Sequence, residues 1–441
     1  MNRNRIVLIV IVAIVPFLTG FISHFKHRSF FYNNDAAIYR NSFKLFKEGR
    51  HTFRHDTFGS EGFWGETLKL HQAIAGEDAG GVGPGVDPAT ALAVGLKVDS
   101  DALPRWLKRD IKRGQVDLES PVTTLALLEL DAVIGVKGHF DEAGQLTTMG
   151  IQCALCHSTV DDSFSPGIGK RLDGWPNRDL NVGAIISLAP DLSSVASLLA
   201  TDQSTVRDVL ATWGPGKFDA GLLLDGKAFR PDGKTGATLI PPAYGLAGVN
   251  LATYTGWGSV PYWNGFVSNL EMHGHGTFLD PRLNNPDQFP IAAAIMNGST
   301  RNSPDLTTKK LAALHYYQLS IPAPKPPHNS YDKYKASQGE LLFNNKARCA
   351  ECHVPPLYTE PGYNLRTPEE IGIDSFTADR SPTGKYRTTP LGGLGSRTKG
   401  GYYHDGRFAT LTDVVNHYDT HFNLGLDSKE TDDLVEFLKS L

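Results

Sequence analysis

The chain has 441 residues, of which 43 are lysine or arginine, 47 are aspartate or glutamate, and 40% are hydrophobic. This length supports two or three domains with separate cores, and the composition excludes a disordered or collagen-like protein. The net charge of −4 gives little support for a nucleic-acid partner, because phosphate binding needs a clustered basic surface.

An apolar run lies close to the N-terminus. Residues 6–22 are almost continuously apolar and follow Arg3 and Arg5, which is the pattern of an export signal. The run is long for a cleaved signal and near the lower limit for a membrane span. We therefore favour an uncleaved signal anchor over residues 1–30, with a cleaved signal peptide as the alternative. The rest of the chain is then expected in the periplasm, tethered to the inner membrane.

The remaining chain divides into three regions. Residues 31–118 show little periodicity and are treated as an N-terminal extension of unknown role. Residues 119–327 form the first predicted domain, which ends in the proline-rich segment 321–327. Residues 328–441 form the second predicted domain. Helices are expected over residues 123–134, 192–200, 205–213, 309–319, 340–343, 411–418 and 431–441.

The four cysteines carry the strongest signal. They form two C-x-x-C pairs that begin 196 residues apart, and a histidine follows each pair directly. This is the pattern of covalent c-type haem attachment, in which two thioether bonds hold the haem and the histidine binds the iron. The attachment residues are Cys153, Cys156 and His157 in the first motif and Cys349, Cys352 and His353 in the second.

Three other interpretations of the motifs are weaker. A zinc site would bring both pairs together and would not need a histidine after each. A catalytic dithiol has no requirement for that histidine. A disulfide within one pair would close too short a loop to stabilise the chain. We therefore expect two covalently attached haem c groups.

The second iron ligand of each haem is less clear from sequence. No methionine follows Cys349, so the second haem is left with His404, His417, Tyr418, His421 or water. His417 is favoured, with Tyr418 second, because the expected helix over residues 411–418 could aim either side chain at the iron.

For the first haem, residues 257–263 and 271–278 combine aromatic residues with Met272, His273 and His275. This combination suits either an apolar distal pocket or a bis-histidine site, and His275 is a candidate catalytic residue.

The sequence resembles the bacterial di-haem cytochrome c peroxidase superfamily, which includes methylamine-utilisation di-haem enzymes and rubber oxygenases. The resemblance rests on the two motifs, on residues 339–343, and on the runs 386–390, 401–411 and 433–438. It implies a mainly helical fold with long loops, in which two cytochrome c-like haem domains face each other. It also implies that the first haem is reactive and the second relays electrons.

Several residue roles follow from this resemblance. The distal ligand of the second haem falls at His417 or Tyr418, where peroxidases have methionine and methylamine enzymes have tyrosine. The order of Trp263 and Phe278 is similar to the distal aromatic residues of rubber oxygenases, which makes both candidate catalytic residues.

The same resemblance implies one interdomain calcium ion, with backbone ligands near Lys399 and Gly401. Gly392 departs from the family, which commonly has an arginine there, and Arg387 or Arg397 is the candidate replacement in contact with a haem propionate.

The leading hypothesis is an exported di-haem oxidoreductase whose first haem reacts with peroxide or dioxygen. The alternatives are a pure electron-transfer cytochrome and a rubber oxygenase-like dioxygenase acting on an apolar substrate. Without residues 1–30, which carry four basic and no acidic residues, 39 basic against 47 acidic residues leave a charge of −8. The expected partner is therefore a small basic electron carrier, either a cytochrome or a cupredoxin.

Overall fold

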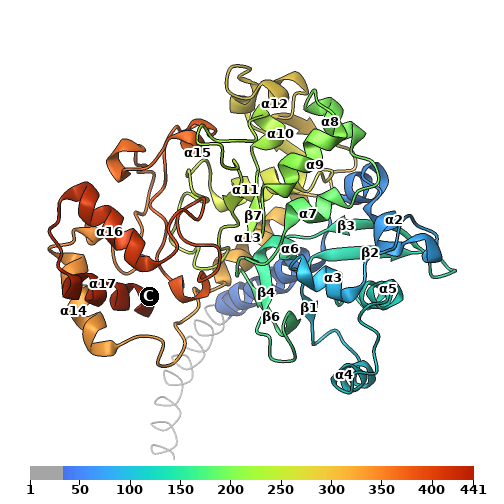
Figure 1. Ribbon diagram of the computed structural model, residues 1–441, viewed down its shortest axis with the longest axis horizontal. Coiled ribbons are helices and arrows are strands. Elements are labelled where there is room, and N and C mark those ends of the chain that lie inside the picture. Colours follow the sequence, from blue (N-terminus) through green and yellow to red (C-terminus); the bar gives the residue numbers. More distant parts are fainter. Residues whose placement is uncertain (1–32) are drawn as a thin grey trace, which may run out of the picture.

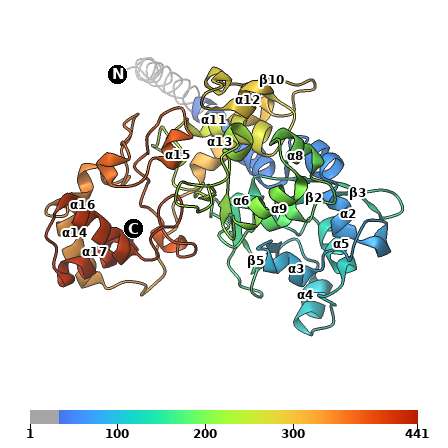
Figure 2. The ribbon, with the colours of Figure 1, turned by 45° about the horizontal axis from the view of Figure 1, so that its top comes forward.

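The computed structural model describes residues 33–441, in which helices predominate and strands are short. The mainly helical fold predicted from the sequence is confirmed. Figures 1 and 2 show a smaller C-terminal lobe, in orange and red, beside a larger lobe. Within residues 33–441, no helix has both the length and the apolar character needed to span a membrane. The signal anchor expected over residues 1–30 lies outside the described residues.

The larger lobe begins with a long helix over residues 33–55. Shorter helices and two-stranded ladders follow, packed around one main hydrophobic cluster and two smaller ones. Its further helices are α2 (Leu70–Ala75), α3 (Pro88–Ala93), α4 (Arg105–Lys112), α5 (Pro121–Glu129), α6 (Ala154–His157), α7 (Val182–Ser187), α8 (Ser193–Leu198), α9 (Gln203–Ala211), α10 (Leu222–Asp225), α11 (Val260–Phe266), α12 (Pro290–Ala294) and α13 (Leu311–Ser320). The predicted helices correspond to α5, α8, α9 and α13.

Five strand pairs complete this lobe. One pair is parallel, β1 (Val98–Asp99) with β5 (Ile168–Gly169). The antiparallel pairs are β2 (Val136–Phe140) with β3 (Leu146–Ile151), β4 (Ser158–Val160) with β6 (Arg171–Asp173), β7 (Lys217–Phe218) with β8 (Thr238–Leu239), and β9 (Thr277–Leu279) with β10 (Ser299–Arg301).

The N-terminal extension is built into this core. Phe53, Trp64 and Leu107 belong to the same buried cluster as Ile134 and Leu155, which come from the first predicted domain. The segment contains the helix over residues 33–55, which the sequence analysis missed. After that helix little periodicity is visible because the later helices are short, six residues in α2 and α3 and eight in α4. The extension therefore contributes directly to the surroundings of the first C-x-x-C-H motif.

A hairpin of β2 and β3 leads into the first motif, where the sequence predicted a helix as far as residue 134. Helix α5 ends early because Asp131 takes a left-handed conformation with φ 52°, and Gly135 follows with φ 83°. A Cβ atom at Gly135 would lie 2.2 Å from the backbone nitrogen of Leu155. The hairpin backbone thus packs directly on the residues between the two cysteines.

The C-terminal lobe contains α14 (Lys333–Asn344), α15 (Phe376–Asp379), α16 (Leu411–Phe422) and α17 (Ser428–Ser440). Helices α14, α16 and α17 correspond to predicted helices. Phe343 of α14 and Phe437 of α17 meet with ring centroids 5.1 Å apart in a separate buried cluster. The helices cross closely at Gly339, where a Cβ atom would lie 2.0 Å from the carbonyl oxygen of Asp433.

Buried arginine–aspartate pairs join the two lobes. Arg380 of the C-terminal lobe reaches Asp225 at 2.8 Å and Asp219 at 2.9 Å, both in the larger lobe. In the opposite direction, Arg230 of the larger lobe pairs with Asp374 and Asp405. Because each lobe inserts a cation among the other's carboxylates, the contact fixes the relative position of the lobes.

Replacing Gly339 should separate helices α14 and α17. We expect Gly339→Ala to lower the free energy of unfolding by about 1–3 kcal/mol, because the added methyl group overlaps the backbone of α17. Urea denaturation followed by circular dichroism measures this loss. Gly62→Ala is the matched control, since a Cβ atom there would lie 4.0 Å from Nε2 of His275, at an ordinary contact distance. Equal midpoints for both variants would contradict the close crossing.

Candidate functional site

The first motif is held in a defined orientation. Cys153 precedes α6, and this short helix carries Cys156 and ends at His157. The Nδ1 atom of His157 donates to the carbonyl oxygen of Pro241 at 3.1 Å, which fixes the ring and leaves Nε2 available as a ligand. Burial lowers the pKa of His157 to about 4, so the imidazole is neutral over the physiological range and able to bind a metal.

The second motif repeats this arrangement. His353 donates from Nδ1 to the carbonyl oxygen of Tyr358 at 3.0 Å, and burial lowers its pKa. Both histidines therefore use one ring nitrogen to fix the side chain and keep the other for an axial bond. This shared geometry is what an iron ligand in each C-x-x-C-H motif requires.

The cysteines are unsuited to the competing chemistries. All four are free thiols, and burial raises the pKa of Cys153, Cys156 and Cys349 to about 12. A reactive dithiol instead needs a lowered pKa, and a zinc site needs thiolates gathered around one ion. The first pair opens onto a cavity of about 290 Å³, which His157 also lines.

Three buried arginines test whether haem fits these sites. Arg178, Arg387 and Arg397 each have at least one buried N–H group without a hydrogen-bond partner, and none forms an ion pair within residues 33–441. For Arg387, burial without a nearby anion lowers the pKa to about 10. Buried cations of this kind need negative charge from a bound group. Haem propionates meet that need, so the residues present fit the cofactor.

These arginines also connect the two motifs. Arg387 lines the cavity of the first motif, while Arg397 lies close enough to His353 to lower its pKa. Tyr254 is buried among all three guanidinium groups and lines the same cavity. The family commonly has an arginine where this chain has Gly392. The positions of Arg387 and Arg397 are consistent with the prediction that either residue replaces it. Arg178 is a third candidate, which the sequence analysis did not single out.

Glu271 is the functional candidate that the sequence analysis missed. It ends the π-helical turn η3 (Val267–Glu271), lines the cavity and lies near enough to Cys156 to raise the pKa of that thiol. Burial, with a smaller contribution from Asp219, holds the pKa of Glu271 well above its usual range. Burial therefore favours the protonated form of this carboxyl group. Its only sequence signal was its position beside Met272 and two histidines.

The residues predicted around the first haem separate into two groups. Trp263 and Met272 line the cavity, and the indole Nε1 of Trp263 has no hydrogen-bond partner. Phe278 does not line it and packs instead in an aromatic cluster, with its ring centroid 5.7 Å from that of Phe266. His275 is exposed and packs beside Gly59, outside the cavity lining. The two regions diverge because His273, with φ 55°, turns the chain after η3.

At the second motif the structure places the two ligand candidates differently. The Nε2 atom of His417 donates to the carbonyl oxygen of Ile371 at 3.0 Å, and its ring is part of a surface hollow. Tyr418 is enclosed by protein and close enough to Cys352 and Cys349 for those groups to raise its pKa. This placement favours Tyr418 over His417. His404 instead stacks on Tyr386, with ring centroids 5.0 Å apart.

No observation supports the expected calcium ion. Lys399 Nζ contacts the two carboxylate oxygens of Asp179 at 2.7 and 2.9 Å, so a protein cation already occupies this part of the lobe junction. Asp374, His404 and Asp405 come within metal-binding distance of one another, but Arg230 and Arg407 pair with both carboxylates. The calcium ion stays a prediction.

Comparison with known proteins identifies the class. The chain is similar to methylamine utilization protein MauG of Methylorubrum extorquens, with 25% identity over 229 residues that cover 44% of this chain and 62% of that protein. It is also similar to cytochrome-c peroxidase IdrP1 of Denitromonas iodatirespirans, with 27% identity over 246 residues that cover 41% and 64%. The chain spans less than two thirds of the length of these curated relatives. No family model matches it.

Among solved structures, a MauG-like protein associated with microbial copper homeostasis is 19% identical, with a TM-score of 0.28 over 49% of this chain and 77% of that one. A similarity at this level supports no conclusion about the site. The motifs and the two curated relatives define a c-type haem protein. The chain is similar to proteins of the di-haem cytochrome c peroxidase and MauG-like superfamily.

Removing the guanidinium group of Arg387 should change the reduction potential of the haem at the first motif. We expect Arg387→Met to lower the reduction potential of the haem there, because a lost positive charge favours the oxidised form. Potentiometric titration of the purified protein measures this shift. Lys385→Met removes the same charge from an exposed side chain two residues away and should leave the potential nearly unchanged. Identical potentials in both variants would remove Arg387 from the haem environment.

The ligand of the second haem can be assigned by substitution. We expect Tyr418→Phe to change the electron paramagnetic resonance signal of that haem, because the phenol oxygen is the buried donor near the cysteines. His417→Ala should leave the signal unchanged, since its ring is already hydrogen-bonded at the surface. The reverse result would restore His417 as the ligand.

Proposed function

We propose that this chain is a di-haem c-type oxidoreductase in which two haem domains face each other and the first haem reacts with peroxide or dioxygen. The observation that carries this proposal is Glu271, a carboxyl group in the lining of the cavity of the first motif, where desolvation holds its pKa well above the usual range. A cytochrome that only transfers electrons has no use for a proton donor there. The two curated relatives supply the reaction class, since one is named a cytochrome-c peroxidase.

Haem iron, when bound, supplies the redox chemistry that activates an oxygen–oxygen bond. The residues of the chain supply position and protons. His157 binds from one side with a ring fixed by Pro241. Glu271 would act as the proton donor at this cavity, since its raised pKa favours the protonated form. Trp263 forms an apolar part of the wall that limits the entry of water.

The second haem is proposed to relay electrons to the first. Tyr254 and the three buried arginines lie between the two motifs, with Arg387 at the first cavity and Arg397 near His353. Their positive charge would also hold the propionates of both haems in this region. Tyr418 is the proposed closing ligand of the second haem, which would make that site unreactive towards small molecules.

One observation favours the electron-transfer alternative. Met272 lines the first cavity and is buried, so its thioether is a possible sixth ligand that would close the first haem to substrates. The dioxygenase alternative has less support, because Phe278, unlike Trp263, does not line the cavity. A high-spin first haem that responds to peroxide would support the enzyme. Two low-spin haems that do not respond would support the cytochrome.

Location and partner follow from the haem attachment. Covalent haem c is added after export, and residues 1–30 carry the pattern of an export signal, so we propose a periplasmic protein tethered to the inner membrane. The charge of −8 outside that segment favours a small basic cytochrome or cupredoxin as electron donor. Fractionation of cells and salt-dependent reduction by a basic cytochrome test these two points.

Glu271→Gln tests the proposed acid. We expect it to slow the reaction with peroxide roughly 100-fold or more, because the amide cannot donate the required proton. In the unmodified protein the rate should fall as pH rises through the raised pKa of Glu271, since only the protonated form donates. This alkaline decline should disappear in the variant.

Stopped-flow absorbance at the haem, recorded across pH, provides both measurements. Glu66→Gln makes the same change at an exposed position and should leave the rate unaltered. A normal rate and pH profile in Glu271→Gln would exclude the carboxyl group as the acid.

A further inference from the structure

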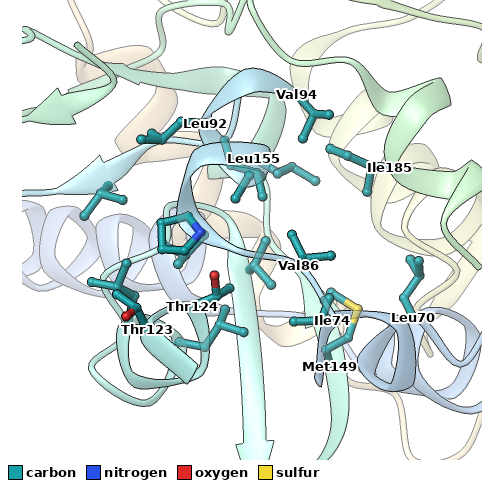
Figure 3. Close-up of a pocket in the computed structure, with 18 of the residues that line it drawn as sticks. Leu70, Ile74, Val86, Leu92, Val94, Thr123, Thr124, Met149, Leu155 and Ile185 are labelled. Atoms are coloured by element: carbon teal, nitrogen blue, oxygen red, sulfur yellow. The ribbon is translucent and has the colours of Figure 1, made fainter. Parts of the chain in front are cut away.

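A second cavity lies beside the first haem site. It has a volume of about 90 Å³ and is lined almost entirely by aliphatic side chains (Figure 3). Leu70, Ile74 and Leu92 come from the N-terminal extension, whereas Leu155 and Ile185 come from the first predicted domain. The extension, for which the sequence indicated no role, thus forms much of the wall of this chamber.

The chamber and the haem cavity share part of their lining. Trp64, Ile151, Leu155 and Val182 belong to both. Leu155 stands between the two cysteines of the first motif, so one side chain of the haem attachment segment separates the two spaces. At the same time the lining includes Leu118 and Leu188, which are 37% and 39% exposed. The chamber therefore has contacts with both solvent and the haem site.

The chemistry of the lining excludes polar occupants. A buried water needs two to four polar partners, and an engineered aliphatic cavity of about 150 Å³ stays dry and binds benzene or xenon. The hydroxyl groups here are those of Thr123, which donates to the carbonyl oxygen of Asp117 at 2.7 Å, and Thr124, whose Oγ1 has no partner. A single free hydroxyl cannot satisfy water or hydrogen peroxide. An uncharged apolar diatomic molecule requires no hydrogen bond and fits the volume.

We propose that this chamber binds dioxygen and delivers it to the first haem. The inference rests on the proposed function only in treating the first haem as the reactive one; occupancy of the chamber is independent of that reaction. The proposal also distinguishes between dioxygen and peroxide as the co-substrate, because an aliphatic chamber concentrates dioxygen and not peroxide.

Xenon is a direct probe of the chamber. We expect crystals of the haem-loaded protein under xenon pressure to show xenon among Ile74, Val86 and Leu155, the side chains drawn in Figure 3. The variant Ile185→Phe should lose this xenon, because the larger ring fills the space. Ile186→Phe is the matched control, since Ile186 is the next residue of α7, is also half-buried and lines neither cavity. It should retain the xenon.

Delivery is tested by ligand association. Carbon monoxide, an apolar diatomic probe, should bind the reduced first haem several-fold more slowly in Ile185→Phe than in the unmodified protein or in Ile186→Phe. Leu92→Phe fills the chamber from α3 and should slow carbon monoxide binding in the same way. With this second variant, a folding defect in either one alone cannot explain the result. The rate with peroxide should be unchanged in all three variants.

Absence of xenon from the chamber would overturn the proposal, and so would unchanged carbon monoxide rates in both filled variants. Failure of the proposed function gives a different result. In that case the first haem of the unmodified protein would bind neither carbon monoxide nor peroxide, whether or not xenon occupies the chamber.

Discussion

Three guanidinium groups lie buried near the junction of the two lobes, and none has a carboxylate partner in the described chain. Removing one partner of a buried ion pair typically costs about 3–5 kcal/mol, so buried cations left alone are a strong constraint on a fold. Arg178, Arg387 and Arg397 become favourable once a bound group brings negative charge to them. Haem propionates bound here would therefore become part of the electrostatics that holds this junction together.

Other charges at the junction are matched within the protein. Arg380 and Arg230 each cross from one lobe to the carboxylates of the other, whereas the unmatched arginines surround Tyr254 between the two motifs. The junction thus combines a permanent ionic contact with a region whose charge balance depends on the cofactors. This division would keep the lobes aligned while the charge of a bound haem changes.

The features that the sequence predicted correctly are those encoded by the spacing of residues close together in the chain. Both C-x-x-C-H motifs and most helices were visible, because each is encoded within a few residues. The cavity residues were harder to find, since Glu271 is 114 positions after His157 in the chain and its raised pKa arises mainly from burial, with a smaller contribution from Asp219. His417 and Tyr418 show the limit most clearly. Neighbouring residues on a helix point about 100° apart, so the packing of α16 decides between them, and the sequence does not contain that angle directly.

The contact between Arg380 and the larger lobe also depends on the order in which the chain is synthesised. A ribosome produces Asp219 and Asp225 first, and the arginine that neutralises them comes 155 residues after Asp225. Until then, two acidic groups destined for the interior lack the cation that neutralises them. The buried ionic contact across the junction therefore forms only after the C-terminal lobe has been made.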